Sequence, residues 1–257
     1  MEKKREILEE QIKQALTSTF KVISNHIEDK NSKNKDSKIK TLDFSEIKDL
    51  KSKNDYIRLR ANTDSKALKI RFSDHGIFIK NQPKNPALSK IYELSEKIRC
   101  EMLGSKMLNG IKKNLENNYY QKINNEKYKD VNAKKDINVL DAFELYIIEK
   151  FFKLNLSEIS QKTLSYWRKD FDKNFDNHLN YLIENFENQE NYNSKFSQLL
   201  EKMDIFENDQ NQESNQNQDN QNQSNNDTSG DEENNDKQDS QDKVSEDQLS
   251  VETDYDV

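Results

Sequence analysis

Residues 139–152 read VLDAFELYIIEKFF, and this stretch decides the fold. Its apolar side chains recur at helical spacing, at Leu140, Phe143, Ile147, Ile148 and Phe151. Such spacing places them on one face of an α-helix, and their density requires that other elements cover most of that helix. The stretch therefore predicts the central, most buried helix of an α-helical domain.

Amphipathic helical patterns continue on both sides of this central helix. Before it, Asn85-Pro86 marks a helix start, because Asn caps well and Pro is tolerated at the first helical position. Three further stripes, which cover residues 88–103, 164–186 and 192–203, have the same periodicity. Trp167 fits the second of these stripes and is expected in the core.

The first helix is expected within residues 1–28. One face of that helix is predicted to carry the following apolar and small residues: Leu8, Ile12, Ala15, Leu16, Thr19, Phe20, Ile23 and Ile27. A polar linker is expected over 29–40, followed by a mainly α, bundle-like domain over 41–206.

One segment departs from the helical pattern. From 57 to 60, apolar and basic residues alternate, and the alternation returns from 68 to 72. A period of two is typical of a β-strand, so the segment predicts a short β-hairpin with the polar residues 62–66 as its loop. A helix over 64–72 stays open as an alternative, because its first residues could cap it and Leu68 and Phe72 lie four positions apart.

Charge divides the chain into a basic body and an acidic tail. Residues 207–257 hold 16 Asp or Glu against two Lys, a charge of -14, whereas the whole chain carries -7, so residues 1–206 carry +7. The tail is nearly free of apolar residues, and ordering a backbone costs about 1–2 kcal/mol per residue. We therefore expect a disordered acidic tail that acts mainly as a spacer.

Motifs that would support chemistry are missing from the sequence. Four glycines do not form a phosphate-binding loop of either common type. His26, His75 and His178 are far apart, and the single Cys100 has no partner at ligand spacing, so no metal site and no catalytic residues are predicted. No apolar run is long enough to span a bilayer, and residues 1–10 lack an export signal, so we expect a cytoplasmic protein without membrane contact.

Three parts of the sequence resemble the CobT-type subunit of aerobic cobaltochelatase. The first is R-x3-D-S-x-A-L from Arg60 to Leu68, and the second is EKIRCEMLGSKMLNG over 96–110. The third lies between Leu164 and Ile205 and includes Trp167 and Gln189. The resemblance covers roughly residues 56–206, and the acidic tail resembles the acidic linker of that family.

The resemblance implies a role in a three-part ligase that forms nitrogen–metal bonds. In this family a large subunit inserts Co2+ into the corrin ring during cobalamin biosynthesis, and an AAA+ ATPase subunit hydrolyses ATP with Mg2+. The CobT-type subunit binds the ATPase ring and couples it to the large subunit. The family's C-terminal von Willebrand A domain is missing here, so a truncated form is expected. The chain itself is expected to bind no cofactor and to be a non-catalytic, accessory subunit.

The residues proposed for the partner interface come from the first two motifs: Arg60, Asp64, Ser65, Arg99 and Glu101. On a helix that begins near Pro86, Arg99 lies off the apolar face and is available for a specific contact. Two roles fit this position of Arg99: an ion pair inside the domain, for example with Asp64 or another acid of the predicted hairpin, or an anchor for the ATPase.

Two other classes of function stay open. In the first, the basic body contacts nucleic acid and the acidic tail inhibits that contact. Nucleic acid is the less expected partner of the two. The chain could also be a helical adaptor that has no link to a chelatase.

Overall fold

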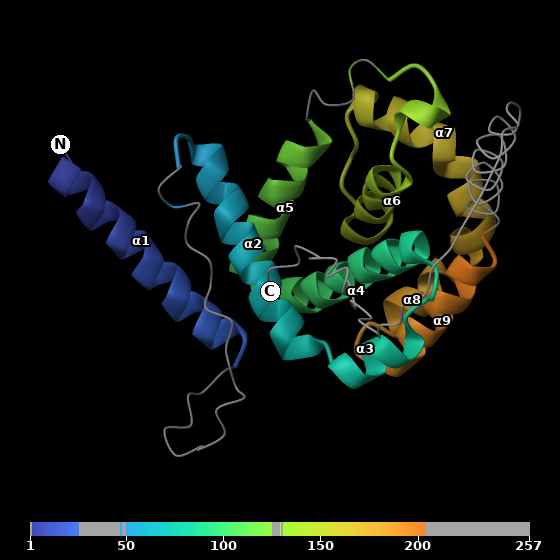
Figure 1. Cartoon of the computed structure of the whole chain (residues 1–257), viewed down its shortest axis with the longest axis horizontal. Coiled ribbons are helices and arrows are strands. Elements are labelled where there is room, and N and C mark those ends of the chain that lie inside the picture. The colour runs from blue at the N-terminus through green and yellow to red at the C-terminus, as the bar shows by residue number, and fades with distance from the viewer. Residues whose placement is uncertain (1, 26–46, 48–49, 125–128, 130, 204–257) are drawn as a thin grey trace, which may run out of the picture. The chain divides into compact units, whose positions relative to one another are not determined.

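The computed structural model describes residues 2–25, 47, 50–124, 129 and 131–203 (Figure 1). These residues fall in one compact unit. Helices and turns make up the described ranges, which contain no strand, in agreement with the mainly α prediction. The linker predicted over 29–40 and the tail predicted over 207–257 lie outside the described residues.

The stretch 139–152 forms the centre of the fold. It begins as α6 (Val139–Ile147), capped by Asn138, and continues as a π-helical turn (Ile148–Phe152). The turn ends at Lys153, which has φ 57° in the left-handed region. Phe143 and Tyr146 are fully buried and pack against rings of α7 (Glu158–Phe175). The prediction that this stretch is the most buried helix is confirmed.

Charged pairs attach the π-helical turn to α7. Arg168 forms two hydrogen bonds with the Glu149 carboxylate, at 2.7 and 3.0 Å. The Lys150 ammonium lies 3.0 Å from Asp176 and 3.5 Å from Asp172. The neighbouring residues Glu149 and Lys150 thus both contact charged residues of α7 from within this π-helical turn.

The stripe at 164–186 is divided between two helices. After α7, a single 3-10 turn (Asp176–His178) leads into α8 (Leu179–Glu184) and then α9 (Gln189–Glu201). Trp167 is half-buried and stacks on Phe171, and the Lys134 ammonium lies 4.0 Å from the centre of its indole ring. Trp167 thus lies at the edge of the core, packed on Phe171, and is less buried than predicted.

Helices α2 (Lys53–Phe72), α4 (Pro86–Met107) and α5 (Asn109–Ile123) pack on one another (Figure 1). Asn85 caps α4 as predicted, through hydrogen bonds from the backbone N–H groups of Ala87 and Leu88. A Cβ atom added at Gly104 would meet the Leu68 side chain at 2.4 Å. Glycine at this position therefore sets how closely α4 approaches α2.

The predicted β-hairpin is wrong, because residues 53–72 form the single helix α2. A reciprocal capping box between Ser52 and Asp55 starts this helix, well before the 64–72 helix considered as the alternative. Buried residues lie on several sides of α2, since α1, α4 and α5 all contact it. Such a helix has no single apolar stripe, and the resulting scatter of apolar residues resembles a period of two.

The two remaining helices are α3 (His75–Asn81) and α1 (Glu2–Ile23). Asp74 caps α3, which packs against α9. Leu16 of α1 forms a small cluster with Leu59 of α2 and with Ile47. Leu8 of the predicted α1 stripe is exposed, so the stripe faces α2 only in part.

Candidate functional site

The most extensive polar arrangement inside the domain is centred on Arg99 of α4. Glu96 and Arg99 lie one helical turn apart, and both side chains are 1% exposed. The Arg99 guanidinium donates to both carboxylate oxygens of Glu96 at 2.8 Å. Burial is the largest single effect and disfavours the charged guanidinium, but hydrogen bonding to Glu96 and the nearby charges together outweigh it and raise the pKa of Arg99 above its usual value.

Arg99 also fixes the ends of two other helices. Its guanidinium donates to the carbonyl of Phe72, the last residue of α2, at 2.6 Å and to the carbonyl of Phe186, just after α8, at 2.7 Å. The last carbonyls of a helix lack partners within it, so a buried cation satisfies them well. The Gln189 side chain reinforces this junction through the backbone N–H and carbonyl of Asp74, at 2.7 and 3.0 Å.

A second buried carboxylate, Asp64, links α2 to α5, and its neighbour Arg60 links α2 to α1. Asp64 is 0% exposed and accepts hydrogen bonds from Asn114 of α5 at 2.7 Å and from Arg60, one turn earlier on α2, at 3.3 Å. Arg60 also donates to the Thr19 hydroxyl of α1 at 3.2 Å. Desolvation outweighs these favourable contacts and raises the pKa of Asp64.

The third buried acid, Glu101 of α4, pairs with α5. The Tyr119 hydroxyl donates a short hydrogen bond to it, and the Lys97 ammonium lies 3.8 Å away. Burial, followed by the Glu101 charge, raises the pKa of Tyr119 well above its usual range. Ser65 is also buried, on α2.

The five residues predicted for a partner interface therefore occupy two neighbouring helices. Only Arg60 keeps appreciable exposure, with 22% of its side chain accessible. The structure does not pair Arg99 with Asp64; the acid beside Arg99 is Glu96. Contact of any of the five with a partner stays a prediction.

Sequence reasoning missed several members of these networks. The most important are Glu96, Asn114, Tyr119 and the side-chain role of Gln189. The spacing of Glu96 and Arg99, three positions apart on a helix, was a usable signal for an ion pair. The other contacts depend on which helices meet, and no local spacing reveals that.

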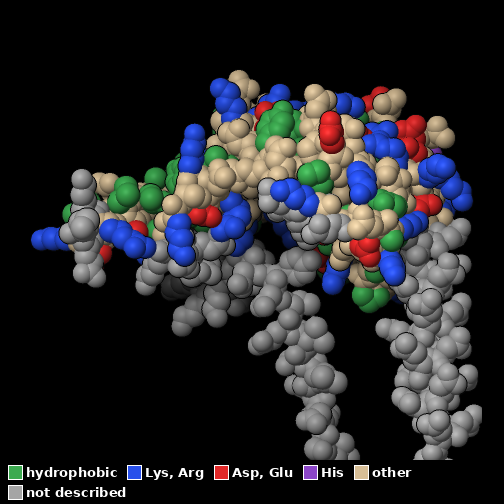
Figure 2. All heavy atoms as spheres, turned by 90° about the horizontal axis from the view of Figure 1, so that it is seen from above, with side chains coloured by type: hydrophobic (Ala, Val, Ile, Leu, Met, Phe, Trp, Pro, Cys, Tyr) green, Lys and Arg blue, Asp and Glu red, His purple; other side chains and the backbone are tan. Residues whose placement is uncertain are grey.

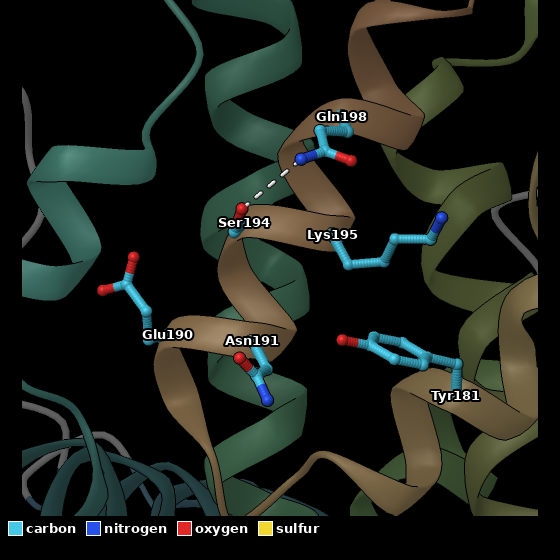
Figure 3. Close-up of a pocket in the computed structure, with 6 residues that line it drawn as sticks. All are labelled: Tyr181, Glu190, Asn191, Ser194, Lys195 and Gln198. Atoms are coloured by element: carbon cyan, nitrogen blue, oxygen red, sulfur yellow. Dashed lines mark hydrogen bonds between the residues drawn. The ribbon is translucent and has the colours of Figure 1, made fainter.

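The surface hollow shown in Figure 3 lies along the outer side of α9. Tyr181 of α8 and Glu190, Ser194 and Lys195 of α9 border it, and its volume is about 180 Å³. The Lys80 ammonium, 2.9 Å from Glu190, lowers the pKa of that carboxyl. Small-molecule sites usually enclose about 300–1,000 Å³ of mostly apolar space, so this open polar hollow does not have their character.

No group of three or more His, Cys, Asp or Glu able to hold a metal ion occurs within the described ranges. The helices in those ranges also include none that is long and apolar enough to cross a membrane. Figure 2 shows one face of the molecule, where basic and acidic side chains are interspersed with small hydrophobic areas.

Comparison with protein-family models gives a match over nearly the whole chain. The family model described as cobalamin biosynthesis protein CobT matches residues 8–256, and so includes nearly all of α1 and every later helix. No curated protein and no solved structure matches the chain.

Proposed function

Because the chain belongs to the family of cobalamin biosynthesis protein CobT, we propose that it is an accessory, non-catalytic subunit of an aerobic cobaltochelatase. Membership places the chain in cobalamin biosynthesis. In the proposed role it binds the AAA+ ATPase subunit and couples it to the large subunit. Those partners supply the ATP and Mg2+ chemistry and insert the substrate Co2+ into the corrin ring. The extent of the family match is the observation that carries this proposal.

The interior of the domain suits a subunit that acts by binding. Arg99 and Gln189 join the α2–α3 junction to the α8–α9 junction, and Asp64 joins α2 to α5. Buried hydrogen bonds between helices favour one arrangement of those helices, because an unpaired buried polar group is costly. A rigid helical body of this kind can transmit the movement of an ATPase ring to another subunit without changing its own fold.

Co-purification tests the proposed partner. The immobilised full chain is mixed with the cognate AAA+ subunit in the presence of ATP and Mg2+, and in a parallel experiment with double-stranded DNA over a range of salt. We expect retention of the ATPase and no DNA binding beyond that of an unrelated protein of similar charge. Retention of DNA with a steep salt dependence, without the ATPase, would instead support the nucleic-acid alternative.

Two neighbouring arginines allow a matched test of the interface on α2. Arg60 is a predicted interface residue, whereas Arg58 is more exposed and lies 3.8 Å from Asp55. We expect Arg60→Gln to weaken ATPase binding more than Arg58→Gln does, with both values corrected for the folded fraction measured by circular dichroism. Equal effects of the two substitutions would remove Arg60 from the interface.

A further inference from the structure

Helix α1 is held to the domain mainly through a single neighbour. Its main contacts are with α2, beside which it lies (Figure 1). None of the described side chains of residues 3–11 is buried, whereas Leu16, Phe20 and Ile23 in the second half of the helix are at most 5% exposed. An element with so few buried apolar contacts opens at a lower free energy than the core of the domain.

Two arginines of α2 add polar contacts with α1. Arg60 donates to the Thr19 hydroxyl at 3.2 Å, and Arg71 donates to the carbonyl of Ile23 at 3.1 Å. Both arginines are at least partly exposed, so water can replace these hydrogen bonds when α1 leaves. The polar contacts therefore orient α1 on α2 without adding much to the free energy that holds it there.

Helix α2 has other neighbours that keep it in place without α1. Helices α4 and α5 both pack on it. Asp64 of α2 accepts a hydrogen bond from Asn114 of α5 at 2.7 Å, and Leu68 packs directly against Gly104 of α4. Release of α1 therefore leaves α2 attached to the rest of the helical body.

The surface of α2 beneath α1 includes a residue proposed for the ATPase contact. Leu59 is 4% exposed and forms a cluster with Leu16 of α1, and the next residue, Arg60, keeps only 22% of its side chain accessible. Asp64 and Thr19 already accept hydrogen bonds from this guanidinium. A partner thus gains fuller access to Arg60, and to the apolar surface of Leu59, once α1 moves away.

We propose that α1 is a releasable cover over Leu59 and Arg60, and that its release opens this surface of α2 to the ATPase subunit. The proposal rests on the proposed function, because the partner is that of the chelatase complex. Only chains with α1 released are then competent to bind through this surface. The apparent affinity for the ATPase is accordingly lower than the intrinsic affinity, in proportion to the fraction of chains in the released form.

Hydrogen–deuterium exchange of the full chain tests whether α1 is released on its own. An isolated helix frays in water, so we expect the amides of residues 16–23 to exchange faster than those of α2 and α4. Leu16→Ala should shift α1 toward the released form by about 30-fold or more and accelerate the exchange of residues 16–23 accordingly. The control Leu8→Ala, the same change at a position that is 56% exposed, should leave that exchange unchanged.

Titration with the AAA+ subunit tests whether α1 covers its binding surface. Leu16→Ala should bind the ATPase more tightly than the wild type does, by up to the factor measured in exchange, and Leu8→Ala should bind as the wild type does. Thr19→Val removes only the hydroxyl that holds Arg60 and should give a smaller gain, which can be measured even if Leu16→Ala does not fold. Arg60→Gln combined with Leu16→Ala should reduce the gain.

Three results would overturn the proposal. In exchange, Leu16→Ala could accelerate α2 and α4 as much as α1, which would show that α1 is not released separately. In the titration, the wild type could bind the ATPase as tightly as Leu16→Ala and Thr19→Val do, or the gain could persist undiminished in the variant that also carries Arg60→Gln. Binding of the ATPase by none of these proteins would contradict the proposed function itself, and the role of α1 as a cover would be rejected with it.

Discussion

Arg99 brings a full positive charge into the interior, and its removal should leave several groups without partners. Arg99→Met deprives the buried Glu96 carboxylate and the carbonyls of Phe72 and Phe186 of their donor. Breaking a buried ion pair on one side typically costs about 3–5 kcal/mol. We expect a loss of that size in the free energy of unfolding, measured by urea denaturation.

The double variant Glu96→Gln with Arg99→Met is the control. It removes the uncompensated buried charge along with the arginine, so it should be more stable than Arg99→Met alone. At a temperature where Arg99→Met is still folded, binding to the ATPase distinguishes the two roles predicted for Arg99, and binding that persists assigns this buried residue to the interior alone. Loss of binding by the folded variant would instead show a direct contact between Arg99 and the partner.

Asp64 gives a prediction about pH. Its pKa is raised above the ordinary value of 3.8, so between 3.8 and the raised value the folded state binds more protons than the unfolded state. The contribution of Asp64 to stability is therefore fully present below pH 3.8 and is lost as pH rises through the folded-state pKa.

Asp64→Asn does not titrate, which isolates this contribution. We expect the free energy of unfolding of the wild type, relative to that of Asp64→Asn, to fall as pH rises above 3.8. Urea denaturation of both proteins at several pH values measures this difference in the free energy of unfolding. A relative stability that rises with pH instead would show that the contacts with Arg60 and Asn114 outweigh desolvation.

At the scale of elements, the two glycines of α4 and α5 should respond in opposite ways to alanine. A Cβ at Gly104 collides with Leu68, whereas a Cβ at Gly110 meets nothing within 4 Å. Overpacking a core typically costs about 1–3 kcal/mol, so Gly104→Ala should destabilise the domain. Gly110→Ala should stabilise it by about 0.5–1 kcal/mol, because alanine is the better helix former. Thermal melts of both variants and of the wild type check this. A melting temperature of Gly104→Ala equal to that of the wild type would mean that Leu68 moves aside at little cost.

The helices that sequence predicts best are those with dense apolar residues or clear caps. The dense apolar residues of 139–152 and the Asn85 cap locate α6 and the start of α4 correctly. Helix α2 was misread because neighbours cover it on several sides, so its buried residues include Ala61, Thr63 and Ser65 as well as leucines. The capping box formed by Ser52 and Asp55 was the local signal that could have corrected the error.

The polar networks were less accessible to sequence reasoning. The expectation that an acid inside the domain could pair with Arg99 is met by Glu96, on the same helix. The carbonyls of Phe72 and Phe186 could not be foreseen, because their positions depend on where two other helices end in space. For the same reason, the bond between Tyr119 and Glu101 required the packing of α4 on α5.

For the whole molecule, the proposed function is that of a subunit that works by binding. Nearly all of α1 and every later helix lie within residues 8–256, which the CobT family model matches, and Arg99 fixes the ends of α2 and α8. The catalytic chemistry of the proposed enzyme then belongs to the large subunit and the ATPase. The chain's contribution should be visible only when all partners are present.

Reconstitution of cobalt insertion tests whether the chain has the proposed role. The purified large subunit and AAA+ ATPase are supplied with ATP, Mg2+, Co2+ and the corrin substrate, with and without the full chain, and the cobalt–corrin product is followed by its absorbance. We predict that insertion requires the chain and saturates as the chain is added. Insertion at the same rate without the chain would contradict the account.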